Sequence, residues 1–193
     1  MAFRVLLSST WLLTITLYSC SNKYPVIQCQ TEMGNFEIEI YVDRAPVTAA
    51  NFIKYVQENR FNDAKFYRVV RDDNQPDNPV KIDVIQGGLF EDEHPLRLPP
   101  IAHETTLETG IRHVDGVISM ARLEPGTASS EFFICVGDQP ELDYGGRRNN
   151  DGQGFAAFGR VIKGLNVVKL IHQQNAKEQY FDPPIKIYRF VSD

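Results

Sequence analysis

Short stretches of alternating apolar and polar residues constrain this chain most, because such alternation turns one face of a β-strand to a core and the other to water. Residues 36–41 show it most clearly, in the order Phe, Glu, Ile, Glu, Ile, Tyr. Gly34 and Asn35 separate this strand from another at Val26–Thr31, and a glycine at the first turn position suits a tight hairpin. Further strands are predicted at Lys65–Val70, Val80–Gln86, Gly116–Ala121, Glu131–Val136, Ala156–Ile162 and Ile185–Val191. So many short strands predict a barrel or a sandwich.

Two segments have the periodicity of helices. The first begins at Pro46, which the first turn of a helix tolerates, and carries apolar residues at 49, 52, 53 and 56. The second runs from Leu165 to about Gln173. Because these helices fall at opposite ends of the strand series, they would fit the two mouths of a closed barrel. Residues 71–79, rich in Asp, Asn and Pro, are predicted to form an irregular loop.

The composition is that of one globular domain. Of 193 residues, 42% are apolar and 23% are charged, which excludes a wholly disordered chain. The net charge is −5, and lysine and arginine are scattered singly. Nucleic-acid binding is therefore not expected, because it usually requires a basic patch.

The first 19 residues resemble a secretory signal. A single charge, Arg4, precedes an apolar run of about 13 residues, which is short for a membrane span of about 20. The run ends in Leu-Tyr-Ser-Cys20, which resembles a bacterial lipoprotein signal cleaved before a lipid-bearing cysteine. We expect a signal peptide at 1–19, a lipidated tether at 20–25 with Cys20 as the attachment point, and the folded domain at 26–193. The protein would then be anchored in the bacterial cell envelope, facing the periplasm. A secreted protein with an ordinary cleaved signal, and a retained anchor, are the alternatives.

The usual catalytic and metal-binding motifs do not occur in the sequence. There is no Gly-x-Ser-x-Gly elbow, no phosphate-binding glycine loop and no His-Glu-x-x-His helix. The four histidines have no recurring ligand spacing, so we expect solvated side chains and no metal site. Residues 143–154 lack the spacing of a calcium loop and are predicted to form a surface loop.

Several segments, taken in order, resemble the cyclophilin family of peptidyl-prolyl cis–trans isomerases. They are Arg44–Phe52, Phe66–Val70, Val84–Phe90, Gly116–Arg122, Ser129–Ile134, Glu141–Asp143 and Phe155–Val161. The resemblance implies a mainly β fold, a closed eight-stranded antiparallel barrel capped by two helices, with an active groove on its outer face. It covers residues 26–191.

The resemblance also implies a reaction, the rotation of an Xaa-Pro bond. Amide resonance opposes this rotation with a barrier of about 18–20 kcal/mol, and lowering it requires no cofactor. The nitrogen of the twisted amide regains a lone pair, to which a guanidinium can donate a hydrogen bond. The implied partners are proline-containing unfolded polypeptides, bound by a monomer.

Individual residues match the family's site. Arg68 matches the catalytic arginine, Gln86 the glutamine that positions it, and Phe133 the floor of the proline pocket. Phe132 and Phe133 point to opposite faces of their strand, so that one can fill the barrel while the other lines the groove. The remaining substrate-binding residues are Tyr67, Val84, Ala121, Arg122, Glu131, Leu142 and Phe155, with Ala121 and Arg122 acting through their backbone groups.

Two departures from the family pattern support an alternative function. Asp83 stands where many members carry a pocket phenylalanine, and Glu131 where they carry glutamine. Glu131 could pair with Arg68 and either orient it or restrain it. A proline-binding chaperone module with little turnover is therefore the second hypothesis.

The two cysteines of the folded domain remain undecided on sequence alone. Cys29 and Cys135 could form a disulfide in an oxidising compartment, or could be small buried thiols.

Overall fold

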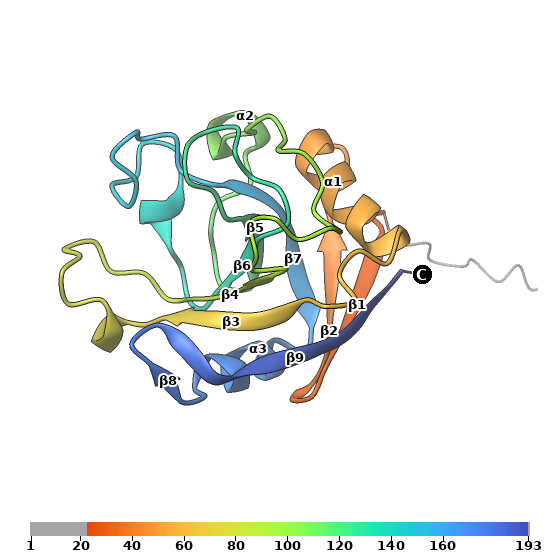
Figure 1. The fold of residues 1–193 in the computed structure, drawn as a ribbon. Coiled ribbons are helices and arrows are strands. Elements are labelled where there is room, and N and C mark those ends of the chain that lie inside the picture. Colours follow the sequence, from red (N-terminus) through yellow and green to blue (C-terminus); the bar gives the residue numbers. More distant parts are fainter. Residues whose placement is uncertain (1–22, 193) are drawn as a thin grey trace, which may run out of the picture.

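The computed structural model describes residues 23–192. Eight antiparallel strands form a closed barrel in the order β1-β2-β7-β5-β6-β4-β3-β9, and pairing of β1 with β9 closes it (Figure 1). The barrel predicted from the sequence is thereby confirmed. The elements, in chain order, are β1 (Val26–Thr31), β2 (Gly34–Ile40), α1 (Pro46–Gln57), β3 (Lys65–Val70), the 3-10 helix η1 (Asp72–Asn74), β4 (Val84–Gly88), α2 (Thr106–Thr109), β5 (Val117–Met120), β6 (Phe132–Cys135), the 3-10 helix η2 (Pro140–Leu142), β7 (Ala156–Lys163), α3 (Leu165–His172), β8 (Ala176–Lys177) and β9 (Tyr180–Ser192).

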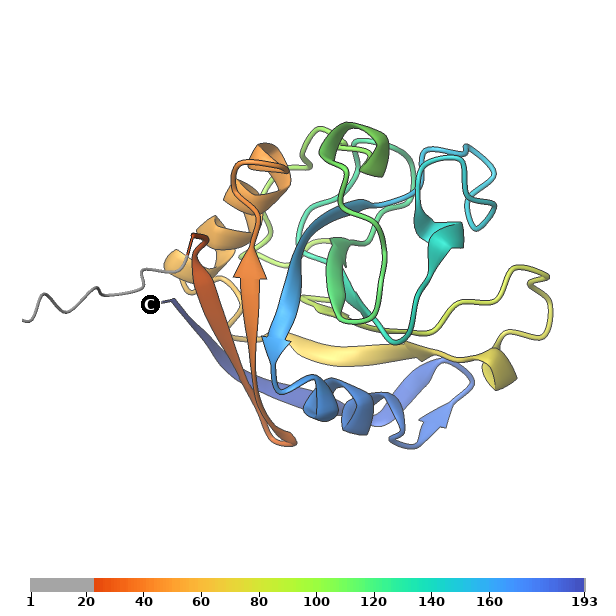
Figure 2. The same cartoon turned by 180° about the vertical axis from the view of Figure 1, so that it is seen from behind.

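The predicted helices α1 and α3 lie at opposite ends of the barrel, as the views in Figures 1 and 2 show. α1 begins at Pro46, and the Glu104 carboxylate accepts hydrogen bonds from the free N–H groups of Val47 and Thr48. None of the helices among residues 23–192 is long and apolar enough to span a membrane.

Aromatic side chains fill the barrel beneath α1. Phe52 of α1 lies at the centre, with ring centroids 5.1–5.6 Å from those of Phe61, Phe132, Phe158 and Phe190. A second, smaller apolar cluster is separate from this core. Its buried members are Val70, Ile82, Val84, Phe133, Cys135 and Leu142. The fold thus provides an apolar surface besides the core that stabilises it.

The structure corrects the predicted hairpin and adds a helix. Thr31 pairs with Gly34, so Glu32 and Met33 form the turn, and Gly34 begins β2. Gly34 has a φ of +125°, and a Cβ there would meet Val167 at 3.1 Å, which explains the glycine. The four-residue helix α2 is not among the predicted helices, and a capping box between Thr105 and Glu108 stabilises it locally.

Two strand boundaries also differ from the prediction. β4 begins at Val84 and not at Val80. β9 begins at Tyr180, five residues before the predicted start at Ile185, and it also pairs with the two-residue β8. Residues 183 and 184 are both proline, and they fall between the pairings of Ile185 and Tyr180 with β3, where the register shifts. Proline has no N–H group to donate to a neighbouring strand, and it is tolerated at such a bulge because the ladder of hydrogen bonds is interrupted there.

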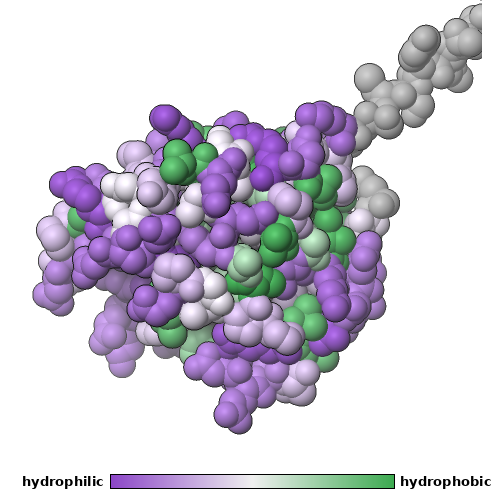
Figure 3. All heavy atoms as spheres, turned by 90° about the horizontal axis from the view of Figure 1, so that it is seen from above, coloured by the Kyte–Doolittle hydropathy of each residue, from purple (hydrophilic) through white to green (hydrophobic). Residues whose placement is uncertain are grey.

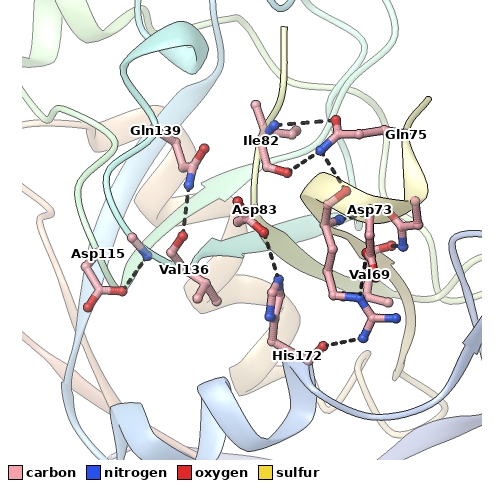
Figure 4. A network of polar contacts seen from close by, with 12 residues as sticks. Val69, Asp73, Gln75, Ile82, Asp83, Asp115, Val136, Gln139 and His172 are labelled. Atoms are coloured by element: carbon pink, nitrogen blue, oxygen red, sulfur yellow. Dashed lines mark hydrogen bonds and ion pairs between the residues drawn. The ribbon is translucent and has the colours of Figure 1, made fainter. Parts of the chain in front are cut away.

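The 71–83 segment is tied to the barrel by polar contacts, shown in Figure 4. Gln75 is buried, and its Nε2 donates to the carbonyls of Arg71 (2.9 Å) and Ile82 (2.7 Å). Arg71 Nη1 donates to the carbonyl of His172 at the end of α3 (2.9 Å). His172 Nε2 lies 3.4 Å from Asp83 Oδ1, and burial lowers the pKa of this histidine. The predicted irregular loop therefore has a defined conformation.

Candidate active site

A groove of about 620 Å³ lies over the smaller apolar cluster. All ten groove residues predicted from the sequence line it. They are Tyr67, Arg68, Val84, Gln86, Ala121, Arg122, Glu131, Phe133, Leu142 and Phe155. The structure thus brings together residues from β3, β4 and β6 and from the loops around them.

Arg68 on β3 is held by two glutamines. Its Nη1 donates to Gln86 Oε1 (2.8 Å), while Nε and Nη2 donate to Gln179 Oε1 (3.0 and 2.5 Å). Gln179, between β8 and β9, in turn donates to the carbonyl of Asn74 (3.0 Å). Burial lowers the pKa of Arg68, but an arginine stays charged. Of its five N–H groups, these contacts use three, so two N–H groups have no partner within residues 23–192 and remain for a substrate.

Glu131 does not pair with Arg68, and the expected ion pair is wrong. Its carboxylate accepts hydrogen bonds from the Tyr67 hydroxyl (2.5 Å) and from the backbone amide of Phe90 (3.0 Å). Tyr67 in turn accepts from Gln86 Nε2 (2.6 Å), and Gln86 accepts from Arg68. Burial, with Glu131 nearby, raises the pKa of Tyr67, which therefore stays protonated. Because a carboxylate only accepts, it fixes the direction of every hydrogen bond as far as Arg68.

This chain of hydrogen bonds predicts a positioning role for Glu131 and Tyr67. We expect Glu131→Gln and Tyr67→Phe each to lower kcat about fivefold, which corresponds to about 1 kcal/mol for one hydrogen bond, with KM little changed. The double variant should be no slower than either single variant, because both changes break the same chain. Steady-state isomerase kinetics on all three variants test this. Multiplicative losses would contradict the chain.

The proline pocket is apolar and backed by Phe133. The Phe155 ring stands edge-on to Phe133, with centroids 5.2 Å apart, and Leu142 is fully buried against the same cluster. Phe132, the neighbour of Phe133, points into the barrel core, as predicted. A flat, buried aromatic floor of this kind suits a prolyl ring.

Asp83 does not occupy the pocket. Its side chain points to His172 on α3, whereas Ile82 lines the groove together with Val84. The expectation that Asp83 replaces a pocket phenylalanine is therefore wrong. Ile82, the residue before Asp83, instead places an apolar side chain at the pocket.

The predicted backbone site at Ala121 and Arg122 is partly occupied. The amide of Ala121 donates to the carbonyl of Glu131 (2.8 Å), so this N–H group does not hold a peptide. The Arg122 side chain forms two hydrogen bonds with the Asp151 carboxylate (2.7 and 2.9 Å) and two with the carbonyl of Gly154. Arg122 thus fixes the loop that carries Phe155, whose ring lies 5.3 Å from its guanidinium.

His113 is buried under the pocket, which contradicts the expectation of solvated histidines. Its ring stacks on Phe133, Nδ1 lies 2.8 Å from Asp143 Oδ1, and Nε2 lies 3.0 Å from Ser119 Oγ. Hydrogen bonding to His113 holds the pKa of Asp143 low despite partial burial. The contacts from Ser119 through His113 to Asp143 are those of a hydrolase triad, but Ser119, which pairs with Phe133 across the sheet, is fully buried and cannot meet a substrate. The three residues instead support the pocket floor.

The two remaining cysteines are free and fully buried, Cys29 in the barrel core and Cys135 in the smaller cluster. Burial raises the pKa of both thiols well above the ordinary value. Residues 23–192 contain no cluster of three or more His, Cys, Asp or Glu that could hold a metal. Cys20 and the predicted signal peptide lie outside the described residues.

A closed barrel with helices at both ends, and with an arginine beside an apolar aromatic pocket, has the fold and the site that the cyclophilin resemblance implies. The chain matches the family of cyclophilin type peptidyl-prolyl cis-trans isomerases over residues 26–191. It is 35% identical over 162 residues to a peptidyl-prolyl cis-trans isomerase of Acinetobacter baylyi, covering 82% of this chain and 77% of the relative. It is 32% identical over 179 residues to peptidyl-prolyl cis-trans isomerase A of Dickeya dadantii, covering 90% and 86%.

Solved structures show the same fold. A cyclophilin type peptidyl-prolyl cis-trans isomerase of Cryptosporidium parvum superposes with a TM-score of 0.68 at 18% identity, covering 88% of this chain and 98% of that one. The protein described here belongs to the cyclophilin-type peptidyl-prolyl cis-trans isomerase family. The family and the enzyme class predicted from the sequence are thereby confirmed.

Proposed function

We propose that this groove isomerises Xaa-Pro bonds, with Arg68 as the catalytic residue that stabilises the twisted amide. The observation that carries the proposal is the clamp on Arg68. Two glutamines fix its guanidinium and leave two N–H groups free beside the apolar pocket. The amide nitrogen becomes basic only in the transition state. A fixed donor aimed at it therefore lowers the barrier to rotation about the Xaa-Pro bond more than it strengthens substrate binding.

The pocket supplies the second half of the mechanism. Phe133, Leu142 and Phe155 hold the prolyl ring, so that the residue before proline rotates against a fixed ring. No proton is transferred and no covalent bond forms, because the reaction changes only a torsion angle. Proline-containing segments of unfolded polypeptides are the expected clients, since a folded protein rarely presents an extended proline to an open groove.

Magnetisation-exchange NMR on an Ala-Pro peptide tests this function. We expect the protein to accelerate cis–trans exchange at catalytic concentration. The chaperone hypothesis predicts peptide binding, with exchange no faster than in buffer. The geometry favours turnover, because Asp83 points away from the pocket and Glu131 accepts a hydrogen bond from Tyr67 and forms no ion pair with Arg68.

We also propose that Cys20 carries a lipid that tethers the domain to the envelope, where its clients would be folding envelope proteins. The Leu-Tyr-Ser-Cys20 junction supports this localisation. Radiolabelled fatty acid should label the full chain and not the Cys20→Ser variant. Label retained by that variant would contradict the anchor.

A further inference from the structure

Two loops extend the groove beyond Arg68. Residues 71–83 and 144–155 project on the same side of the barrel, in yellow and in cyan in Figure 1. Between the first loop and the start of β9 lies a side cavity of about 580 Å³. Arg148, Gln179 and Tyr180 line both this cavity and the groove, so the two hollows adjoin. A bound peptide that continues past the pocket in this direction meets Arg148.

Arg148 is held in place by the first loop. Its Nη1 donates to Gln75 Oε1 (2.8 Å) and to the carbonyl of Val80 (2.6 Å), and its backbone amide donates to the carbonyl of Glu141 (3.1 Å). Within residues 23–192, Nε and Nη2 of Arg148 donate no hydrogen bond, and neither atom is buried. The side chain therefore offers fixed donors to a ligand in the groove.

The charge of Arg148 is not neutralised locally. Four arginines line the groove, and two of them pair with carboxylates, Arg97 with Asp92 and Arg122 with Asp151. Arg68 and Arg148 bind only amide and carbonyl oxygens. Burial, and to a smaller extent repulsion from Arg68, lower the pKa of Arg148.

The side cavity has its own acidic residues, Asp77 and Glu178, and both are exposed. Within residues 23–192, neither Asp77 nor Glu178 forms an ion pair with Arg148, for which a separation of at most 4.0 Å would be required.

The groove also holds two carboxylates, of which Asp92 pairs with Arg97, while Glu131 accepts hydrogen bonds from uncharged donors only among the described residues. Arg68 and Arg148 therefore outnumber the one carboxylate without a cationic partner, and an anion is attracted to the groove more than to the cavity beyond it.

We propose that Arg148 forms a subsite for a carboxylate in the part of the groove beyond Arg68, so that the enzyme prefers client segments with Asp or Glu near the proline. The preference rests on the isomerase function proposed above. A guanidinium with free, parallel N–H groups binds a carboxylate with two hydrogen bonds, and partial burial limits the screening of the pair by salt. Arg148 lies in a loop outside every family motif, so no sequence pattern points to this subsite.

Paired peptides test the subsite. Each pair carries Glu or its neutral isostere Gln at one position, from two residues before to two residues after the Ala-Pro bond, and NMR exchange gives kcat/KM for each. At one position we expect the Glu peptide to exceed the Gln peptide about fivefold, and high salt should reduce this ratio. Arg148→Gln should bring the ratio to about one, and Arg148→Lys should retain part of it.

Arg147→Gln is the matched control, because Arg147 is exposed, pairs with Glu141 and does not line the groove. It should keep the full Glu preference. Equal rates for Glu and Gln peptides at every position, or a ratio that survives in Arg148→Gln, would overturn the subsite. If no peptide is isomerised at all, the proposed function fails instead, so the two failures are distinguishable.

Discussion

Replacing Arg68 with alanine is expected to lower kcat/KM by about 100- to 1000-fold while the barrel stays folded. This is the size of loss that follows removal of one fixed transition-state donor. The loss should fall mainly on kcat, because the donor acts on the pyramidal nitrogen of the twisted amide and has little to bind in the planar ground state. NMR exchange on an Ala-Pro peptide measures the rate, and peptide titration measures the affinity.

Two further variants control for charge and folding. Arg68→Lys keeps a charge but loses the planar fork that the two glutamines hold, so it should remain well below the parent. Arg160→Ala removes an exposed arginine of β7 that does not line the groove, and it should isomerise like the parent. An Arg68→Ala protein that isomerises the peptide as fast as the parent would contradict the proposed mechanism.

The sequence predicted the parts of the site that follow from strand geometry. Alternation along β6 separates Phe132 from Phe133, and antiparallel pairing sets Arg68 opposite Gln86. These positions depend on the two-residue period of a strand and on the register between paired strands, and both can be predicted from the local sequence. The barrel's closure could likewise be expected, because helices fall at both ends of the strand series.

Other parts depend on contacts that no local pattern records. Gln179 lies 111 positions from Arg68 and belongs to no motif, yet it accepts two hydrogen bonds from its guanidinium. The Glu131 carboxylate accepts hydrogen bonds from Tyr67, Phe90 and Ser130, and only packing decides that Arg68 is not among its partners. The position of Asp83 does not follow from the sequence, because the insertion makes the register of the next strand uncertain. In the structure, a hydrogen bond from Gln75 to the carbonyl of Ile82 fixes the chain just before Asp83.

Phe132 and Phe133 provide the second large effect, because one strand directs two identical side chains to different tasks. Phe132→Ala is expected to lower the free energy of unfolding by about 3–5 kcal/mol, since it leaves a cavity inside the barrel. The Phe132 ring lies 5.6–5.9 Å from four others, Phe52, Phe61, Phe66 and Phe190. Urea unfolding measures the loss, and the fraction that remains folded should isomerise at close to the parent rate.

Phe133→Ala is expected to impair catalysis more than it lowers the free energy of unfolding. It removes the floor on which the prolyl ring is buried, worth about 1.5–3 kcal/mol, so kcat/KM should fall about 10- to 100-fold. Its cost in stability should be the smaller of the two, because its cluster is small and opens to the groove, where water can enter the space left by the ring. The comparison is internally matched, since both variants delete the same atoms from adjacent positions. If Phe132→Ala impaired the folded enzyme more than Phe133→Ala does, the assignment of one face to the core and the other to the substrate would be wrong.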